Sequence, residues 1–188
     1  PASKDDHPGF LRQTHHNRLW SGYFGYLPNT FMGNIRNGDF IADRDYPMLL
    51  DMLKRWRLPN GLFRGMSQGQ FHYMGAMTEC LGIIGPMSAM LIQSWEGAIR
   101  VFPAWPTHLD ASYRDLRTRG AFLVSSQLED GEVQYIEIKS EHGGDCRIIN
   151  PWDARILGII HNGVESKIHA GDEFAMTTSR DDVIIVKP

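Results

Sequence analysis

The sequence predicts an α+β protein in which helices come first and an antiparallel β-sandwich follows. Three observations support this fold class. Apolar residues recur at helical spacing up to about Ser94, they alternate with a period of two from Ala98 onward, and Gly, Asn and Asp turns separate the later segments. Because helical and strand patterns are segregated along the chain, they indicate two layers or domains rather than βαβ units.

The clearest helix is predicted over residues 46–56. Pro47 suits its first turn, Asp45 can cap it, and the turn residues at 58–61 end it. Its apolar residues lie at i, i+3, i+4 and i+7 and form one stripe: Leu49, Met52, Leu53 and Trp56.

A second apolar stripe runs through residues 83–94, with Gly97 as the stop. Pro86 leaves two alternatives, because the helix either begins near this residue or is kinked by it. Weaker helix candidates cover residues 18–24 and 30–35, and Leu27-Pro28-Asn29 is expected to separate them.

The second half of the chain predicts short strands. Residues 121–128 and 133–138 form a hairpin whose turn is Glu129-Asp130-Gly131. Four further strands are expected at residues 146–149, 155–160, 173–177 and 183–186. Asn162-Gly163 is expected to lie in a loop.

The composition is that of an ordinary globular protein, with 42% hydrophobic and 22% charged residues in a chain of 188. A net charge of −3 gives no basic footprint, so we expect no nucleic-acid partner and no anionic membrane partner. No apolar run approaches the roughly 20 residues of a membrane-spanning helix. The chain begins with Pro1 rather than Met, which we interpret as a processed product or a piece of a longer polypeptide.

The cysteines and histidines predict no metal site. Cys80 and Cys146 are the only cysteines, and we expect two buried thiols because two cysteines do not make a disulfide framework. Neither a Cys-x-x-Cys nor a His-Glu-x-x-His spacing occurs. Four histidines in the β segments are expected to be exposed to solvent: His108, His142, His161 and His169.

Two stretches resemble glycoside hydrolase family 95. Residues 90–106, MLIQSWEGAIRVFPAWP, are similar to the end of its catalytic barrel, and residues 110–124, DASYRDLRTRGAFLV, to the start of its C-terminal β domain. The family contains inverting α-L-fucosidases and related α-L-galactosidases built on an (α/α)6 barrel. The resemblance therefore implies the last barrel helices at residues 1–105 and the C-terminal β-sandwich at 106–188.

The same resemblance implies a candidate catalytic residue. In the fucosidases an Asp-Gly-Asn-Phe-Gly motif opens the corresponding helix, and its Asp is the general base. Here Thr78 aligns with that Asp, and Glu79 follows one residue later. Glu79 is thus the candidate base of a reaction that needs two carboxyl groups about 6.5–9.5 Å apart. The alternative is a carboxylate that stabilises a helix N-terminus through the macrodipole.

Candidate substrate-binding residues come from the glycine-spaced segment 65–75, because amide, imidazole and aromatic groups bind sugar hydroxyls and apolar sugar faces. These are Gln68, Gln70, His72 and Tyr73. Trp20 is a candidate sugar platform. The alternatives are a structured connector for the segment and a core position for Trp20.

Two functions remain open. The first is the C-terminal part of an inverting glycoside hydrolase acting on α-L-fucosides or related α-linked sugars, with its general acid elsewhere in the same polypeptide. The second is a non-catalytic carbohydrate-binding or structural module. The resemblance implies an oligosaccharide or glycoside substrate, no cofactor, and secretion or a periplasmic location.

Overall fold

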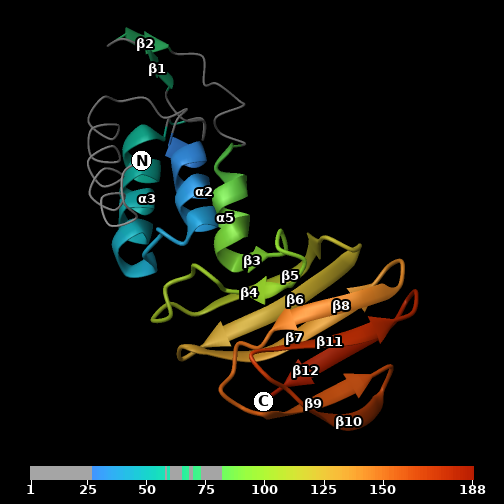
Figure 1. Ribbon diagram of the computed structural model, residues 1–188. Coiled ribbons are helices and arrows are strands. Elements are labelled where there is room, and N and C mark those ends of the chain that lie inside the picture. Colours follow the sequence, from blue (N-terminus) through green and yellow to red (C-terminus); the bar gives the residue numbers. More distant parts are fainter. Residues whose placement is uncertain (1–26, 58, 60–64, 68–69, 73–81) are drawn as a thin grey trace, which may run out of the picture. The chain divides into compact units, whose positions relative to one another are not determined.

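The computed structural model describes residues 27–57, 59, 65–67, 70–72 and 82–188 (Figure 1). The chain divides into two compact units, Pro1–Ala89 and Met90–Pro188. The assignment of residues 1–105 and 106–188 to two domains of a longer enzyme stays a prediction. No helix within the described ranges combines the length and the apolar character needed to cross a membrane.

The first unit begins with α2 (Leu27–Asn37), which extends the weak helix candidate at residues 30–35. The prediction that Leu27-Pro28-Asn29 interrupts the helical region was wrong, because these residues form the first turn of α2. Proline is tolerated there because the first N–H groups of a helix have no partner within the helix. Phe31 of α2 is fully buried.

Helix α3 (Ala42–Trp56) starts earlier than predicted, so Pro47 lies inside it and Asp45 is not its cap residue. Asp45 is 1% exposed and still serves the helix start. Its Oδ2 accepts a hydrogen bond from the Ile41 N–H at 2.9 Å, which satisfies one of the free donors there. The Arg44 guanidinium donates to both Asp45 carboxylate oxygens, at 2.5 and 2.6 Å, and compensates the buried charge.

Helix α5 (Ile84–Leu91) begins two residues before Pro86, which agrees with the first of the two alternatives. It ends earlier than predicted, because the chain enters β3 (Ile92–Gln93) before it reaches Gly97. Strand β3 pairs antiparallel with β4 (Arg100–Val101). Gly97 lies in the loop between them at φ 79°, a conformation that glycine adopts without a steric cost.

The second unit is an antiparallel sandwich. Its larger sheet has the strand order β10-β9-β12-β7-β6-β5. These strands are β5 (Ala111–Thr118), β6 (Phe122–Glu129), β7 (Glu132–Ser140), β9 (Ile156–His161), β10 (Val164–His169) and β12 (Val183–Lys187). The smaller sheet pairs β8 (Gly144–Ile149) with β11 (Glu173–Thr178). Figure 1 shows β8 and β11 across one face of the larger sheet.

Two sheets enclose one hydrophobic core. Val124, Ile136 and Val186 from the larger sheet are fully buried, as is Ile148 from β8. Phe102 and Trp105, which follow β4, also pack in this core. Cys146 is buried as predicted, and desolvation raises its thiol pKa to about 12. Cys80 lies outside the described residues.

Two tight turns with positive φ angles connect neighbouring strands of the larger sheet. Asp130 and Gly131 connect β6 and β7 with φ angles of 51° and 80°, and Asn162 and Gly163 connect β9 and β10 with 49° and 85°. Positive φ at both central residues is the type I′ turn, whose twist matches that of the flanking strands. The predicted 129–131 turn is therefore confirmed, and Asn162-Gly163 is a hairpin turn.

Asp182 ties the β9–β10 turn to the start of β12. Its Oδ2 accepts a hydrogen bond from the Ser179 N–H at 2.7 Å, and its Oδ1 accepts one from the Asn162 amide at 2.8 Å. The His161 Nε2 lies 2.9 Å from Oδ2. His161 is thus only partly exposed and lies against a carboxylate, where exposure to solvent was expected. These donors, the Ser179 N–H first, lower the Asp182 pKa to about 2.

We expect this carboxylate to make stability depend on acid pH. The folded pKa of about 2 lies below the ordinary value of 3.8, so the stabilisation is complete above about pH 4 and is lost as the pH falls toward 2. The melting temperature of the wild type should therefore fall more steeply over that range than that of Asp182→Asn. Thermal unfolding by circular dichroism in steps of pH measures both slopes. Parallel curves would contradict the assignment.

Candidate functional site

The structure places two of the predicted site residues. Gln70 and His72 lie in β2 (Gln70–His72), which pairs antiparallel with β1 (Gly65–Ser67), so that Gln70 is opposite Ser67 and His72 opposite Gly65. The segment predicted as a loop therefore contains a pair of short strands. Four other predicted site residues, Trp20, Gln68, Tyr73 and Glu79, lie outside the described residues. The sugar-binding and catalytic roles of all six residues stay predictions.

A pocket of about 170 Å³ lies in the second unit, where the β3–β4 loop meets the β5–β6 turn and β8. We call it the junction pocket. Its lining residues are Ser94, Gly97, Ala98, Ile99, Arg119, Gly120, Phe122, Asp145 and Arg147.

Backbone hydrogen bonds hold the β3–β4 loop against β8. The Ile99 N–H donates to the Arg147 carbonyl at 2.8 Å, and the Ile149 N–H donates to the Ile99 carbonyl at 2.9 Å. The loop is also joined to the β5–β6 turn, because the Arg119 N–H donates to Ser94 Oγ at 3.0 Å. Three segments distant in sequence are therefore connected by direct hydrogen bonds around the pocket.

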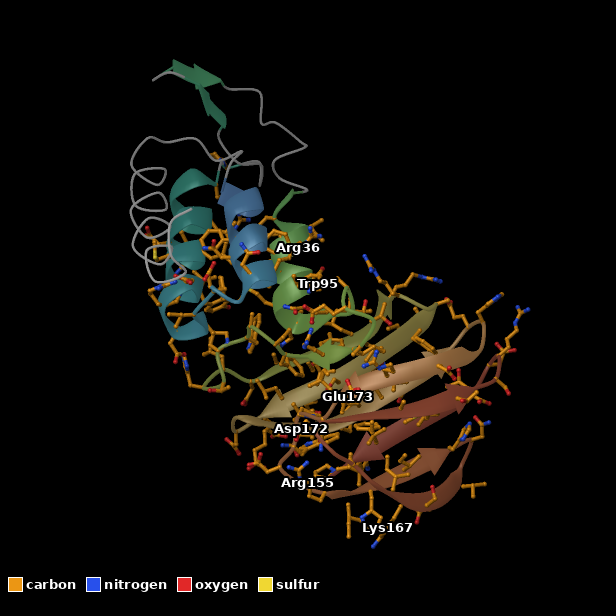
Figure 2. The ribbon with its side chains drawn as sticks, viewed as in Figure 1. Arg36, Trp95, Arg155, Lys167, Asp172 and Glu173 are labelled. Atoms are coloured by element: carbon orange, nitrogen blue, oxygen red, sulfur yellow. The ribbon has the colours of Figure 1, made fainter. Side chains whose placement is uncertain are left out.

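The charged side chains of the junction pocket already have partners in the protein. Arg119 donates through Nη1 to the Trp95 carbonyl at 3.0 Å. Arg147 donates through Nη2 to both Glu173 carboxylate oxygens at 2.9 Å, and Trp95 and Glu173 are labelled in Figure 2. Each guanidinium carries five N–H donors, so further donors remain for a ligand. The N–H donors of Arg119 and Arg147, together with the acceptor oxygens of Asp145, could form hydrogen bonds with the hydroxyl groups of a ligand.

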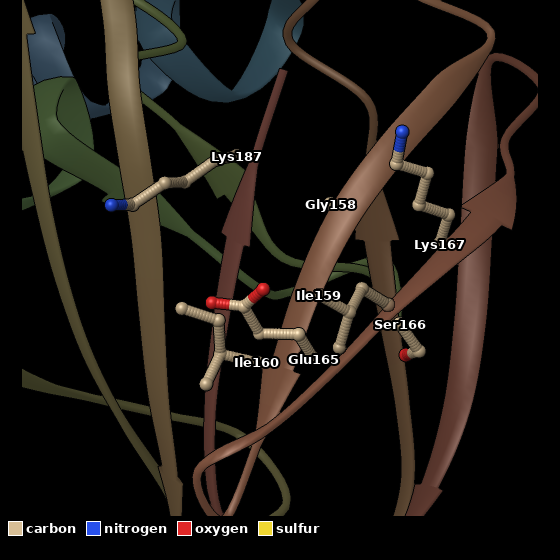
Figure 3. A pocket seen from close by; sticks show the side chains of 7 residues that line it. All are labelled: Gly158, Ile159, Ile160, Glu165, Ser166, Lys167 and Lys187. Atoms are coloured by element: carbon tan, nitrogen blue, oxygen red, sulfur yellow. The ribbon is translucent and has the colours of Figure 1, made fainter.

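A second concavity, which we call the outer groove, has a volume of about 410 Å³ on the outer face of the larger sheet (Figure 3). Gly158 on β9 is paired with Lys167 on β10 and with Lys187 on β12. Because Gly158 has no side chain, it leaves a gap between the two lysines and forms the floor of the groove. Glu165 lies opposite Ile160 in the same register. Figure 3 shows the two lysines on either side of Gly158 and the Glu165 carboxylate beside Ile160. The remaining lining residues are Ile159 and Ser166.

A third concavity, of about 260 Å³, contains two carboxylates, Asp110 and Glu129. Both side chains are exposed and engaged: Asp110 Oδ1 accepts from the Asp130 N–H at 3.1 Å, and Glu129 Oε2 accepts from the Gln127 amide at 3.2 Å. Acid–base catalysis by a carboxyl pair relies on environments that separate the two pKa values. An open surface site of this kind supports a structural role in holding the β6–β7 turn.

Two of the three concavities, the junction pocket and the outer groove, contain a single carboxylate each. The junction pocket has Asp145 as its carboxylate and the outer groove has Glu165, whereas an inverting hydrolase needs a pair. Among the described residues, no three His, Cys, Asp or Glu side chains gather as potential metal ligands.

Sequence reasoning missed Arg119, Asp145 and Arg147 as pocket residues. Arg119 lies within the stretch that resembles family 95, so that stretch contained a signal. Asp145 and Arg147 have no comparable signal, because they reach the pocket only through the packing of β8 beside the β3–β4 loop.

Comparison with known proteins identifies a family relationship for the part of the chain that contains these concavities. The family model described as "Glycoside hydrolase family 95, C-terminal domain" matches residues 93–186, from β3 to β12. No curated protein matches the chain. Among solved structures, the chain is similar to Ara127N-Se, a GH127 β-L-arabinofuranosidase from Geobacillus stearothermophilus T6, with 10% identity and a TM-score of 0.31. That match covers 61% of this chain and 19% of the arabinofuranosidase.

The family model covers half of the chain, and it includes the junction pocket, the outer groove and the strands that carry them. It also contains most of the two stretches whose residues resemble the barrel end and the start of the β domain. The protein therefore belongs to glycoside hydrolase family 95, whose C-terminal domain it carries in residues 93–186.

Proposed function

We propose that this chain is the C-terminal part of an inverting glycoside hydrolase that cleaves α-L-fucosides or related α-linked sugars. The observation that carries the proposal is the match of residues 93–186 to the C-terminal domain of a glycoside hydrolase family. The helices α2, α3 and α5 precede that domain, in the order expected if residues 1–105 are the last helices of an (α/α)6 barrel.

In this proposal Glu79 is the general base that activates water, and the general acid comes from the remainder of the same polypeptide. Gln68, Gln70, His72, Tyr73 and Trp20 contact the sugar. The reaction requires no cofactor, since two carboxyl groups perform inversion: one protonates the leaving oxygen and the other activates water. Action on external glycans would place the enzyme outside the cell or in the periplasm.

Because the proposal places the general acid in the remainder of the polypeptide, it carries an expectation about activity. We expect the purified 188-residue chain to show negligible turnover of aryl α-L-fucosides and aryl α-L-galactosides. The product of the whole open reading frame should cleave one of these substrates. There Glu79→Gln should lower kcat by about 10²–10⁴-fold, because the base is lost. Chromogenic assays measure the rate, and the anomeric configuration of the freshly released sugar shows whether the reaction inverts.

The matched control is Glu132→Gln, an exposed glutamate at the start of β7, which should leave kcat unchanged. Turnover by the purified chain that is unaffected by Glu79→Gln would contradict both the expected inactivity and the role of Glu79. Inactivity of the whole product on every α-L-linked substrate would contradict the proposed reaction.

A non-catalytic carbohydrate-binding or structural module is the second candidate. The junction pocket favours it, because Arg119, Arg147 and Asp145 offer hydrogen-bonding groups without a second carboxylate. Calorimetric titration of fucosylated and galactosylated oligosaccharides distinguishes the two functions. Glycan binding without any product release by the whole open-reading-frame product would favour the second candidate.

A further inference from the structure

Strand β10 (Val164–His169) forms one edge of the larger sheet, and β5 forms the other. The β5 edge has a register shift between Tyr113 and Leu116, with Asp115 at φ 54°. Bulges of this kind protect an edge from pairing with another chain. β10, by contrast, is regular and pairs with β9 along all six residues. Within the described residues of the β unit, no strand covers its other side.

The β9–β10 turn determines which backbone groups of β10 face that open edge. In a hairpin with a two-residue turn, the residues that flank the turn form a hydrogen-bonded pair, here His161 and Val164. Hydrogen-bonded pairs then recur at every second residue. The N–H and C=O groups of Glu165, Lys167 and His169 therefore point to the open edge.

We propose that β10 pairs antiparallel with β10 of a second copy of this chain, with Ser166 on the two-fold axis. This register places Glu165 opposite Lys167 of the second copy and Lys167 opposite its Glu165. Both pairs carry opposite charges, and both use the outward backbone groups of these residues. Val164 and Ile168 of one copy then lie opposite Ile168 and Val164 of the other.

The neighbouring registers are disfavoured by charge. An axis on Lys167 would place two lysines directly opposite each other, and an axis on Glu165 would do the same with two glutamates. Like charges in opposed positions destabilise a strand pair. The chosen register also covers Val164, whose side chain is 69% exposed in the single chain. Ser166, small and uncharged, occupies the close, non-hydrogen-bonded position on the axis.

A charge-swap series measured by sedimentation equilibrium tests this dimer in the 188-residue chain. Glu165→Lys and Lys167→Glu should each raise the dimer dissociation constant at least about tenfold, because each replaces both opposite-charge pairs with like-charge pairs. The double variant restores both pairs and should return the constant to within about threefold of the wild type. Lys187→Glu, on β12 of the same outer face, is the control and should leave it unchanged.

Disulfide trapping tests the axis independently. Opposed residues in a non-hydrogen-bonded pair have Cα atoms about 4.5 Å apart, within the range of a disulfide. Ser166→Cys should therefore form a covalent dimer under mild oxidation. His169→Cys is the matched control, because its counterpart in the second copy lies six residues along the strand, about 20 Å away.

A monomeric wild type at 100 μM and low ionic strength would overturn the proposal. So would a double variant whose dimer dissociation constant stays as high as that of either single variant, or equal crosslinking at positions 166 and 169. Thermal unfolding of each variant verifies that the fold is retained. The proposal does not depend on hydrolase activity, because it rests on the register and charges of β10.

Discussion

Ile148→Ala is expected to lower the free energy of unfolding of the β unit by about 2–5 kcal/mol. Ile148 is fully buried in β8 and belongs to the core between the two sheets. It lies opposite Phe174 of β11 and also forms a bridge with Ile99 next to β4. Truncation therefore leaves a cavity at a position where three segments meet, and the surrounding side chains cannot fill it fully.

Urea unfolding monitored by tryptophan fluorescence measures this loss. The m value should be the same in the variant and the wild type, because a changed m value would indicate that unfolding is no longer the same two-state transition. The control is Ile156→Ala in β9, because Ile156 is 53% exposed. Its substitution should change the free energy of unfolding by no more than about 0.5 kcal/mol. Equal losses at the two positions would show that the packing around Ile148 is not as described.

Gly120→Ala should lower the free energy of unfolding by about 2–4 kcal/mol, for two reasons that act together. Gly120 adopts φ 85°, a conformation that costs energy for residues with a Cβ atom. An added Cβ would also lie 2.6 Å from Cε2 and 3.1 Å from Cδ2 of Phe122. The Phe122 ring is 3% exposed and packs in the core, so it has little room to move away.

Gly158→Ala is the matched control. Gly158 has no left-handed φ angle, and the nearest atom to an added Cβ is the Lys187 carbonyl oxygen at 3.9 Å, an ordinary contact. We expect a change of at most about 1 kcal/mol in either direction in the same urea experiment. A loss at Gly158 equal to that at Gly120 would contradict the steric explanation.

Strand prediction succeeded where alternating apolar residues coincide with turn chemistry. Strands β6 and β7 bury alternate residues, and Asp130-Gly131 joins them in a tight turn. Strand β10 was not predicted, because its sequence Val-Glu-Ser-Lys-Ile-His is exposed over most of its length and carries no apolar alternation. It is a strand because the Asn162-Gly163 turn returns the chain alongside β9.

The helix ends were predicted less well than the helices themselves. Helix α3 starts at Ala42 because Asp45 accepts the Ile41 N–H from within the first turn, an arrangement that a search for a preceding cap residue overlooks. Helix α5 stops at Leu91 because Ile92 and Gln93 pair with Val101 and Arg100. Pairing between distant residues thus overrides helical spacing at that point.

The sequence by itself determined the α+β class, the order of helices before sandwich, most of the sandwich strands and the relationship to family 95. These features depend on side-chain periodicity, turn residues and local motifs, which act over a few neighbouring positions. Only the tertiary structure decided the junction pocket, the outer groove and the open edge of β10. They are built from residues brought together by strand pairing, such as Arg119 with Asp145 and Gly158 with Lys187. A pairing register is a non-local property, because a shift of one residue moves every side chain of a strand to the other face.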